Sequence, residues 1–194
     1  MAFTERSAAT RDAILSAARK LFGEQGYDAT TIRAVAAEVG VDPSMVMRYY
    51  GNKAGLFEAA VDVDLYLEKV SATPRNRLGE ALARHFLSRW EGELSDEATT
   101  LLLRSAATNA DAAERMRTVF DSQVTKVLRD HVGGADAPMR AALLSSQLLG
   151  LALTRYVVKL PPVAAMDTAT LVVAVAPVLQ YYLTADLGST VRKR

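Results

Sequence analysis

The chain has 194 residues, of which 50% are apolar and 23% charged, and this composition is typical of a globular protein and not of a disordered one. Its 23 Lys and Arg residues nearly balance its 22 Asp and Glu residues, so the net charge of +1 gives no sign of nucleic-acid binding by bulk charge. The absence of cysteine excludes disulfides, thiolate metal sites and cysteine nucleophiles, and two histidines leave few ways to build a metal centre or a triad. We therefore expect no metal and no cofactor.

The sequence contains no obvious targeting or membrane segment. Charged residues come early and recur near the N-terminus, which is unlike the apolar region of a signal peptide. The longest apolar stretch, Ala141–Leu153, is interrupted by three polar residues and is shorter than the roughly 18 apolar residues that a membrane span needs. We expect a cytoplasmic protein.

Apolar residues recur at helical spacing along most of the chain, and no period-two alternation is apparent, which predicts an all-α fold of about nine helices. Thr10 is a plausible cap of the first helix, Gly23 and Gly26 end it, and Pro177 is expected to kink the last helix or loosen a turn. The expected helices cover residues 10–22, 31–39, 43–50, 52–70, 78–91, 98–108, 112–132, 139–158 and 167–184.

The segment from Thr31 to Tyr50 matches a helix-turn-helix, in which two short helices cross through a tight turn. The small Ala36 permits the helices to touch, Gly40 permits the positive φ of the turn, and Val46 anchors the second helix. The same spacing also fits an ordinary helical hairpin in a bundle, so both interpretations stay open on the spacing alone.

Residues 10–57 resemble the N-terminal domain of the tetracycline-repressor (TetR) family of transcriptional regulators. The resemblance rests on TRDAILSAARKLFGEQGYDATTI at residues 10–32 and RAVAAEVGVDPSMVMRYYGNKAGLF at residues 33–57, about a quarter of the chain. It implies a TetR-like fold, with a three-helix helix-turn-helix domain at residues 1–55 and a helical bundle for ligand binding and dimerisation at residues 56–194. The chain departs from the family pattern at Met47, where Tyr is usual, and at Tyr49, where His is frequent.

The resemblance also implies which residues meet DNA. The first turn of the second motif helix is expected to meet base edges, whereas the starts of the neighbouring helices are expected to meet phosphates. Met47 cannot donate a hydrogen bond to a phosphate, and Arg48 is equally well explained as a phosphate contact or as a solvated charge. The candidate DNA-binding residues are Thr31, Arg33, Pro43, Ser44, Met45, Tyr49 and Lys53.

The rest of the chain carries none of the common catalytic signatures, so we expect no enzyme. Asp62 and Asp64 are expected on a solvated helix face. The family resemblance implies a small-molecule site among the C-terminal helices, although a structural role is the stronger interpretation of each polar residue there. The ligand-binding candidates are His85, Trp90, Arg104, Gln123, Gln147 and Tyr156.

The last two expected helices are apolar on every side, so the rest of a chain this small can cover only one side of each. A second copy of the chain is the expected cover, as the four-helix dimer interface of the family implies. The sequence thus predicts a homodimeric repressor that binds double-stranded operator DNA and is released by a small molecule. An activator or effector-less regulator on the same scaffold is the alternative, and a helical ligand-binding protein or enzyme with an incidental hairpin is an alternative of another class.

Overall fold

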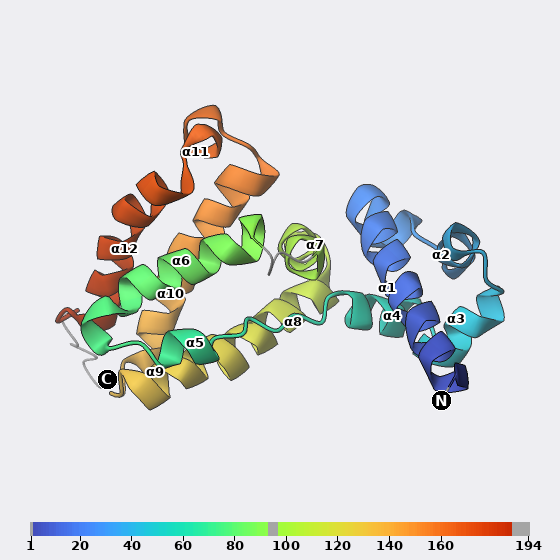
Figure 1. Cartoon of the computed structure of the whole chain (residues 1–194), viewed down its shortest axis with the longest axis horizontal. Coiled ribbons are helices and arrows are strands. Elements are labelled where there is room, and N and C mark those ends of the chain that lie inside the picture. The colour runs from blue at the N-terminus through green and yellow to red at the C-terminus, as the bar shows by residue number, and fades with distance from the viewer. Residues whose placement is uncertain (1, 93–96, 188–194) are drawn as a thin grey trace. The chain divides into compact units, whose positions relative to one another are not determined.

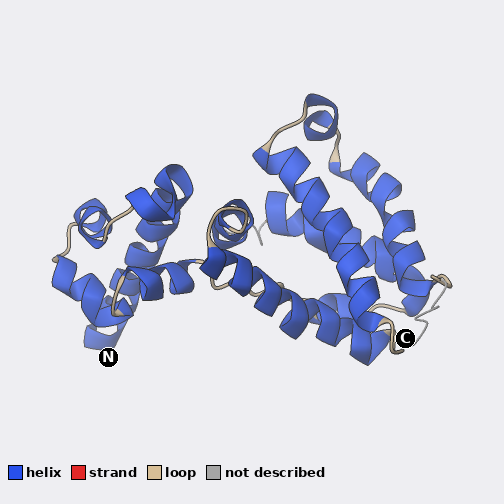
Figure 2. Cartoon of the chain, turned by 180° about the vertical axis from the view of Figure 1, so that it is seen from behind, coloured by secondary structure: helices blue, strands red, loops and turns tan. Residues whose placement is uncertain are grey.

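The computed structural model describes residues 2–92 and 97–187, and the side chains of residues 7–92 and 97–187. In these ranges every regular element is helical and no strand occurs (Figures 1 and 2), which confirms the predicted fold class. Contacts divide the chain into two compact units. The N-terminal unit comprises Met1–Asp64 and Asp96–Arg117, and the C-terminal unit comprises Leu65–Ser95 and Thr118–Arg194.

The N-terminal unit is built around its first helix. Phe22 of this helix packs edge-on against Phe57, with 5.0 Å between the ring centroids, and Tyr27 meets the same Phe57 ring at 5.0 Å. Val35 and Val46 are fully buried and complete the centre of the unit. The helices of the unit are α1 (Ala2–Ala29), α2 (Ile32–Val39), α3 (Pro43–Tyr50), α4 (Lys53–Ala60), α7 (Glu97–Ser105) and most of α8 (Ala110–Val119).

Helix α1 is longer than the sequence predicted. It begins at Ala2 and not after Thr10, and it passes through Gly23 before its geometry breaks at Gly26, where φ is 80°. A glycine inside a helix costs only about 1 kcal/mol relative to alanine, so packing against α2, α4 and α7 is sufficient to carry the helix past Gly23. A positive φ, by contrast, is a conformation that favours glycine, and Gly26 supplies it.

The expected fourth helix ends early, at Ala60, so its prediction was wrong in length. The following residues alternate between the interior and solvent, with Val61 and Val63 buried and Asp62 and Asp64 exposed. This alternation is present in the sequence and is the signal that the helical interpretation overlooked. Both aspartates are therefore exposed, as expected, but neither lies on a helix.

The C-terminal unit is a bundle of longer helices. Helix α8 continues through a π-helical segment into α9, and α10 continues through another. Counted as continuous runs, the described residues form eleven helices, because short α5 and α11 add to the nine expected ones. The elements of this unit are α5 (Glu68–Ser71), η1 (Arg75–Arg77), α6 (Leu78–Glu91), η2 (Phe120–Thr125), α9 (Lys126–His131), α10 (Ala137–Ala152), η3 (Leu153–Val157), α11 (Pro161–Ala165) and α12 (Thr168–Thr184).

Helices α6 and α12 pack closely along one another (Figure 1). A Cβ atom at Gly79 of α6 would fall 2.5 Å from the carbonyl oxygen of Ala176 and 2.6 Å from the backbone nitrogen of Gln180. The backbone N–H of Gly79 also donates to Oε1 of Gln180 at 2.9 Å, so the glycine both permits and benefits from the close approach. Helix α12 continues through Pro177 to Thr184.

The end of α12 is held by a buried arginine of α10. Nη1 and Nη2 of Arg140 donate to the carbonyl oxygens of Tyr182 (2.7 Å) and Ala185 (2.9 Å), and Nε donates to Oδ2 of Asp136 at 2.8 Å. Hydrogen bonding from Arg140 holds the pKa of Asp136 below its usual value, although partial burial opposes this shift. The guanidinium thus satisfies carbonyl groups that a helix end leaves without intrahelical partners. None of the helices in the described ranges is long and apolar enough to cross a membrane.

Candidate nucleic-acid interface

Helices α2 and α3 have the local geometry of a helix-turn-helix. Ala36 is fully buried in α2, and Val46 is fully buried in α3. Gly40 has a φ of 72° and a ψ of 33°, which is left-handed helical geometry, and Val41 donates its N–H to the carbonyl of Ala36 at 3.0 Å. The role that the sequence predicted for each of these residues is confirmed.

The three helix starts of this region are capped by side chains. Thr31 accepts from the N–H of Ala34 at 3.1 Å, Asp42 accepts from the N–H of Ser44 at 2.8 Å, and Asn52 caps α4 in the same way. Hydrogen bonding from Ser44 lowers the pKa of Asp42, which keeps the cap ionised. Each cap lies within three residues of its partner, which is why the sequence revealed the helix starts.

One face of α3 is left open to solvent. Ser44, Met47 and Arg48 are exposed and share this face, since they are three and four residues apart. The predicted base readers Pro43 and Met45 are half-buried, whereas Met47 is 53% exposed. Met47 thus stands on the open face of α3 although it was not among the predicted DNA-binding residues, since its thioether cannot donate a hydrogen bond to a phosphate. An exposed apolar side chain can instead pack on a thymine methyl group.

Lys53 is held in place at the start of α4. Its ammonium donates to the carbonyl oxygen of Asp28 at 3.0 Å and lies 4.5 Å from the centroid of the Tyr27 ring. An ammonium has three donors, so this contact leaves others for a phosphate. Thr31 and Arg33, near the start of α2, are both exposed.

Tyr49 is joined to the first helix of the chain. Its hydroxyl lies 3.1 Å from Oγ of Ser7, and the guanidinium carbons of Arg11 and Arg48 each lie 5.2 Å from its ring centroid. Hydrogen bonding with Ser7, followed by that from Arg48, lowers the pKa of the Tyr49 phenol. The hydroxyl of Tyr50 donates to the carbonyl of Arg11 at 3.1 Å. Ser7 precedes the stretch that carries the family resemblance, and Arg11 stands at its start without a motif role, so no motif drew attention to them.

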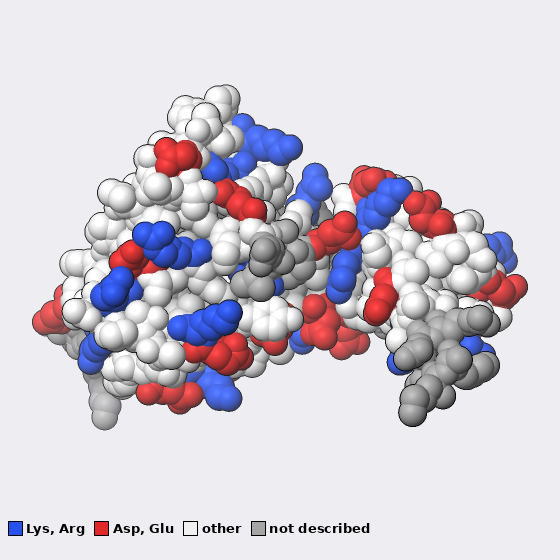
Figure 3. All heavy atoms as spheres, in the orientation of Figure 1, with Lys and Arg blue, Asp and Glu red and all other residues white. Residues whose placement is uncertain are grey.

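The charged side chains of the described residues form no patch of one sign on the face drawn in Figure 3. On the face drawn in Figure 3, basic and acidic side chains are interspersed over both units. This agrees with the balanced composition of 23 basic and 22 acidic residues.

Two of the ligand-binding candidates hold the backbone of one residue. Nε2 of His85 lies 2.6 Å from the carbonyl oxygen of Leu65, and Oε1 of Gln123 accepts from the N–H of Leu65 at 2.7 Å. Leu65 is the first residue of the C-terminal unit. His85 from α6 and Gln123 from the π-helical segment thus fix the start of that unit.

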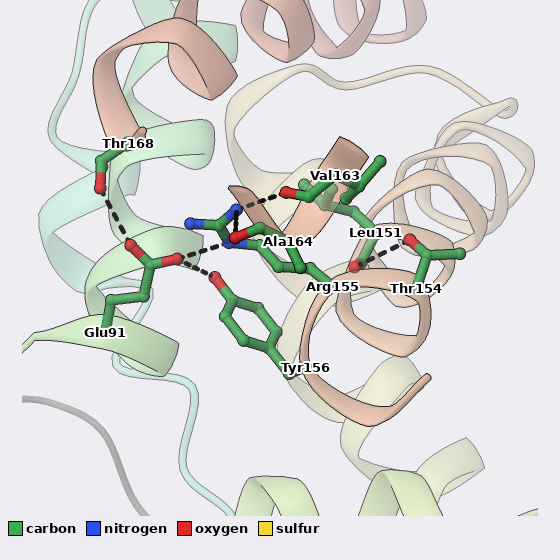
Figure 4. A network of polar contacts seen from close by, with 8 residues as sticks. All are labelled: Glu91, Leu151, Thr154, Arg155, Tyr156, Val163, Ala164 and Thr168. Atoms are coloured by element: carbon green, nitrogen blue, oxygen red, sulfur yellow. Dashed lines mark hydrogen bonds and ion pairs between the residues drawn. The ribbon is translucent and has the colours of Figure 1, made fainter. Parts of the chain in front are cut away.

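Two further candidates, Trp90 and Tyr156, meet near the end of α6, and Tyr156 also belongs to a polar network (Figure 4). Trp90 stacks on Tyr156, with 4.7 Å between ring centroids and 2° between planes. Oε1 of Glu91 accepts from the hydroxyl of Tyr156 at 2.6 Å and from Nε of Arg155 at 2.7 Å, and Oε2 accepts from Thr168 at 2.9 Å.

This network shifts the pKa values of Glu91 and Tyr156 in opposite directions. Burial raises the pKa of the Glu91 carboxyl, but the hydrogen bonds from Tyr156, Arg155 and Thr168 together lower it below its usual value. Burial and the hydrogen bond to Glu91 raise the pKa of the Tyr156 phenol. Glu91 is therefore ionised and Tyr156 is protonated near neutral pH.

The remaining ligand-binding candidates lie apart from these groups. Arg104 is exposed on α7, which belongs to the N-terminal unit, and Gln147 is half-buried on α10. The structure thus brings the candidates together in two pairs and not in one cluster. Neither pair was visible in the sequence, because Leu65 and Glu91 carried no motif.

Two protein-family models match the chain. The family model described as "Bacterial regulatory proteins, tetR family" matches residues 14–60, and the model described as "Tetracyclin repressor-like, C-terminal domain" matches residues 76–183, which is more than half of the chain. The chain belongs to the TetR family. The helix-turn-helix at α2 and α3 is accordingly that of a family of transcriptional regulators, and the recognition made from residues 10–57 is confirmed.

Solved structures and curated relatives agree with this assignment. A TetR-family regulator from Streptomyces coelicolor A3 is 33% identical and superposes with a TM-score of 0.62, over 90% of this chain and 94% of the other. SmeT, solved in complex with triclosan, is 24% identical, with a TM-score of 0.68 over 96% of this chain and 98% of SmeT. The HTH-type transcriptional repressor Rv3405c of Mycobacterium tuberculosis is 40% identical over 76 residues, which are 38% of this chain and 40% of that protein. The first curated relatives are matched over only 19% and 41% of their own length.

Proposed function

We propose that the chain is a homodimeric repressor that binds a partly palindromic operator through α3 and leaves it when a small molecule binds. Its DNA-binding domain is residues 1–55, and residues 56–194 serve effector binding and dimerisation in the cytoplasm. The helix-turn-helix carries this proposal, because buried Ala36 and Val46 and left-handed Gly40 orient α3 so that Ser44 and Met47 stay exposed.

The first step of the proposed function is reading of the major groove by α3. The N-terminal part of such a helix meets base edges, so Ser44 can hydrogen-bond several bases and Met47 can contact thymine methyl groups. Pro43 and Met45 contribute the apolar edge of the same turn. Backbone phosphates are bound by side chains and free N–H groups at helix starts, which assigns Thr31, Arg33 and Lys53 to positioning and not to reading.

Dimerisation is supported by the apolar surface that α10 and α12 leave uncovered. Leu171 and Leu179 of α12 are buried in the subunit, whereas Val173 and Tyr181 of the same helix are 75% and 57% exposed. Met139 and Leu153 are exposed in the continuous helix that contains α10. We assign this surface to a second copy of the chain, because a two-fold axis makes one patch cover itself.

A dimer also supplies what a single α3 lacks. One short helix makes too few base contacts for specific binding, whereas two copies related by a two-fold axis read two half-sites about 34–36 Å apart or a multiple of this spacing. The operator is therefore expected to be palindromic.

The effector is expected to be an apolar or aromatic small molecule bound by the C-terminal unit. SmeT, which shares the fold, binds triclosan. The C-terminal unit contains half-buried Phe86, Trp90 and Tyr156, which are the kind of side chain that lines apolar binding sites. A ligand that favours one of two conformations both stabilises the protein and changes operator affinity.

A gel shift with the DNA that flanks the protein's own gene tests the central claim. We expect a specific complex with the wild type. Ser44→Ala should change base preference in a binding-site selection, whereas Lys53→Ala should weaken specific and random DNA alike. Absence of any complex with the flanking DNA and of any enriched site in the selection would contradict the proposed function. A compound screen for higher melting temperature together with operator release tests the effector claim, and a stabilising ligand that leaves DNA bound would contradict it.

A further inference from the structure

Two guanidinium groups contact the ring of one tyrosine, where the N-terminal half of α1 meets the C-terminal end of α3. Arg11 and Arg48 are exposed, and the guanidinium carbon of each lies 5.2 Å from the centre of the Tyr49 ring. Nη2 of Arg48 also lies 3.5 Å from the Tyr49 hydroxyl. The two arginines are 37 positions apart in the sequence, so only the packing of α1 on α3 brings them together.

Both arginines keep their charge available for a partner. Within the described side chains, neither guanidinium lies within ion-pair distance of a carboxylate, unlike Arg84, Arg117 or Arg155. A guanidinium that contacts a ring with its carbon centre can still present in-plane N–H donors at its edge, and this fork matches the oxygens of a phosphate.

The tyrosine between them is a fixed support. Ser7 holds its hydroxyl at 3.1 Å, and the neighbouring Tyr50 donates to the backbone carbonyl of Arg11, which ties α1 to α3 at the same place. A side chain held in this way loses less conformational entropy when a ligand binds its neighbours. The pair of arginines is thus pre-organised and does not depend on two freely moving surface chains.

The position of the pair relative to α3 and Lys53 indicates the partner. Arg48 shares the exposed face of α3 with Ser44 and Met47. Lys53 lies beside Tyr27 and Asp28, just beyond the break of α1 at Gly26. At 1.5 Å per residue, the regular helix from Arg11 to Gly26 is roughly 22 Å long. A phosphate bound at Arg11 is therefore a different one from a phosphate bound by Lys53.

We propose that Arg11 and Arg48, supported by Tyr49, form a second phosphate-binding site for the DNA backbone, separate from the site at Lys53. This inference rests on the proposed DNA-binding function and adds Arg11 and Arg48 to its contact residues. The site binds backbone phosphate and carries no base preference, so it strengthens binding to any duplex.

The salt dependence of binding to a duplex of about 30 random base pairs tests the site, because each phosphate contact contributes about 0.9 to the slope of log K against log salt. The full chain is used, with fluorescence anisotropy as the readout and circular dichroism to verify folding. The double variant with Arg11→Gln and Arg48→Gln should make this negative slope shallower by about two for each DNA-binding unit, because two phosphate contacts are lost. The matched control Arg84→Gln removes an exposed helical arginine that is already paired with Glu80, and it should leave the slope unchanged.

Three results separate the outcomes. An unchanged slope in the folded double variant, or an equal fall in Arg84→Gln, overturns the second phosphate site while the wild type still binds. Failure of the wild type to bind the duplex even at low salt overturns the proposed function itself. Arg11→Lys with Arg48→Lys keeps the charges and should recover most of the slope, whereas a purely structural role of the guanidinium groups would not be rescued by lysine.

Discussion

One substitution made at two positions of α12 should give opposite results. Val173 is 75% exposed and Leu179, less than two turns further along, is 0% exposed. Replacing either residue by glutamate adds the same charge to the same helix. The two variants therefore compare a face that we assign to the partner subunit with a face that packs inside the subunit.

The expected magnitudes follow from burial. Leu179→Glu loses about 1.5–3 kcal/mol of apolar burial and adds the cost of placing a carboxylate among leucine and valine side chains, so more than about 4 kcal/mol is lost in total. Against a stability of about 5–15 kcal/mol, this loss brings the protein close to unfolding. Val173→Glu should change the stability of the isolated subunit by no more than about 0.5 kcal/mol, but it places two like charges in a dimer interface.

Light scattering after size-exclusion chromatography, combined with thermal melts followed by circular dichroism, distinguishes these results. We expect a folded monomer for Val173→Glu and an unfolded or strongly destabilised protein for Leu179→Glu. A fully dimeric Val173→Glu variant, confirmed by a dimeric Tyr181→Glu variant, would refute the assignment of this face to the partner. A Leu179→Glu variant that melts like the wild type would refute the packing of α12.

Other substitutions test contacts that lie inside one unit or the other. Arg140→Met should lower the free energy of unfolding by about 3–5 kcal/mol, because it leaves Asp136 and two carbonyl groups without their partner. The control Arg84→Met should lower it by no more than about 1 kcal/mol, and urea unfolding at equal protein concentration measures both variants. Gly79→Ala should destabilise the protein by about 1–3 kcal/mol through overpacking against α12. Gly23→Ala, whose new Cβ has nothing within 4 Å, should stabilise α1 by up to about 1 kcal/mol, so the melting temperature should fall in the first variant and rise in the second. The lowered pKa of Glu91 predicts that its network stabilises the protein above the unfolded-state pKa of about 4.3 and loses this effect as the pH falls through the lower folded-state value. The melting temperature of Glu91→Gln should accordingly depend less on pH than that of the wild type in this acidic range, and equal profiles would contradict the role of Glu91.

The sequence was sufficient where the decisive contacts are local. Thr31, Asp42 and Asn52 each cap a helix through an N–H no more than three residues away, and Gly40 ends α2 through its own backbone geometry. Interactions of this kind depend on a few consecutive residues, so the boundaries of α2 and α3 could be predicted. The order of those residues also carried the family resemblance, and with it the fold class.

The sequence failed where a local signal competed with packing. The helical interpretation of the segment after Ala60 overlooked the alternation of Val61 and Val63 with two aspartates, and Gly23 was given more weight as a helix end than its small cost justifies. In both places the buried surface of the N-terminal unit determined the backbone.

Only the tertiary structure decided which side chains act together. The contacts of Ser7 with Tyr49, of His85 with Leu65 and of Glu91 with Tyr156 join residues 42, 20 and 65 positions apart. It also decided which face of α12 is buried, because a helix that is apolar on every side has no pattern that distinguishes Leu179 from Val173. Contacts between distant segments depend on how whole helices pack, and helical periodicity describes one helix at a time.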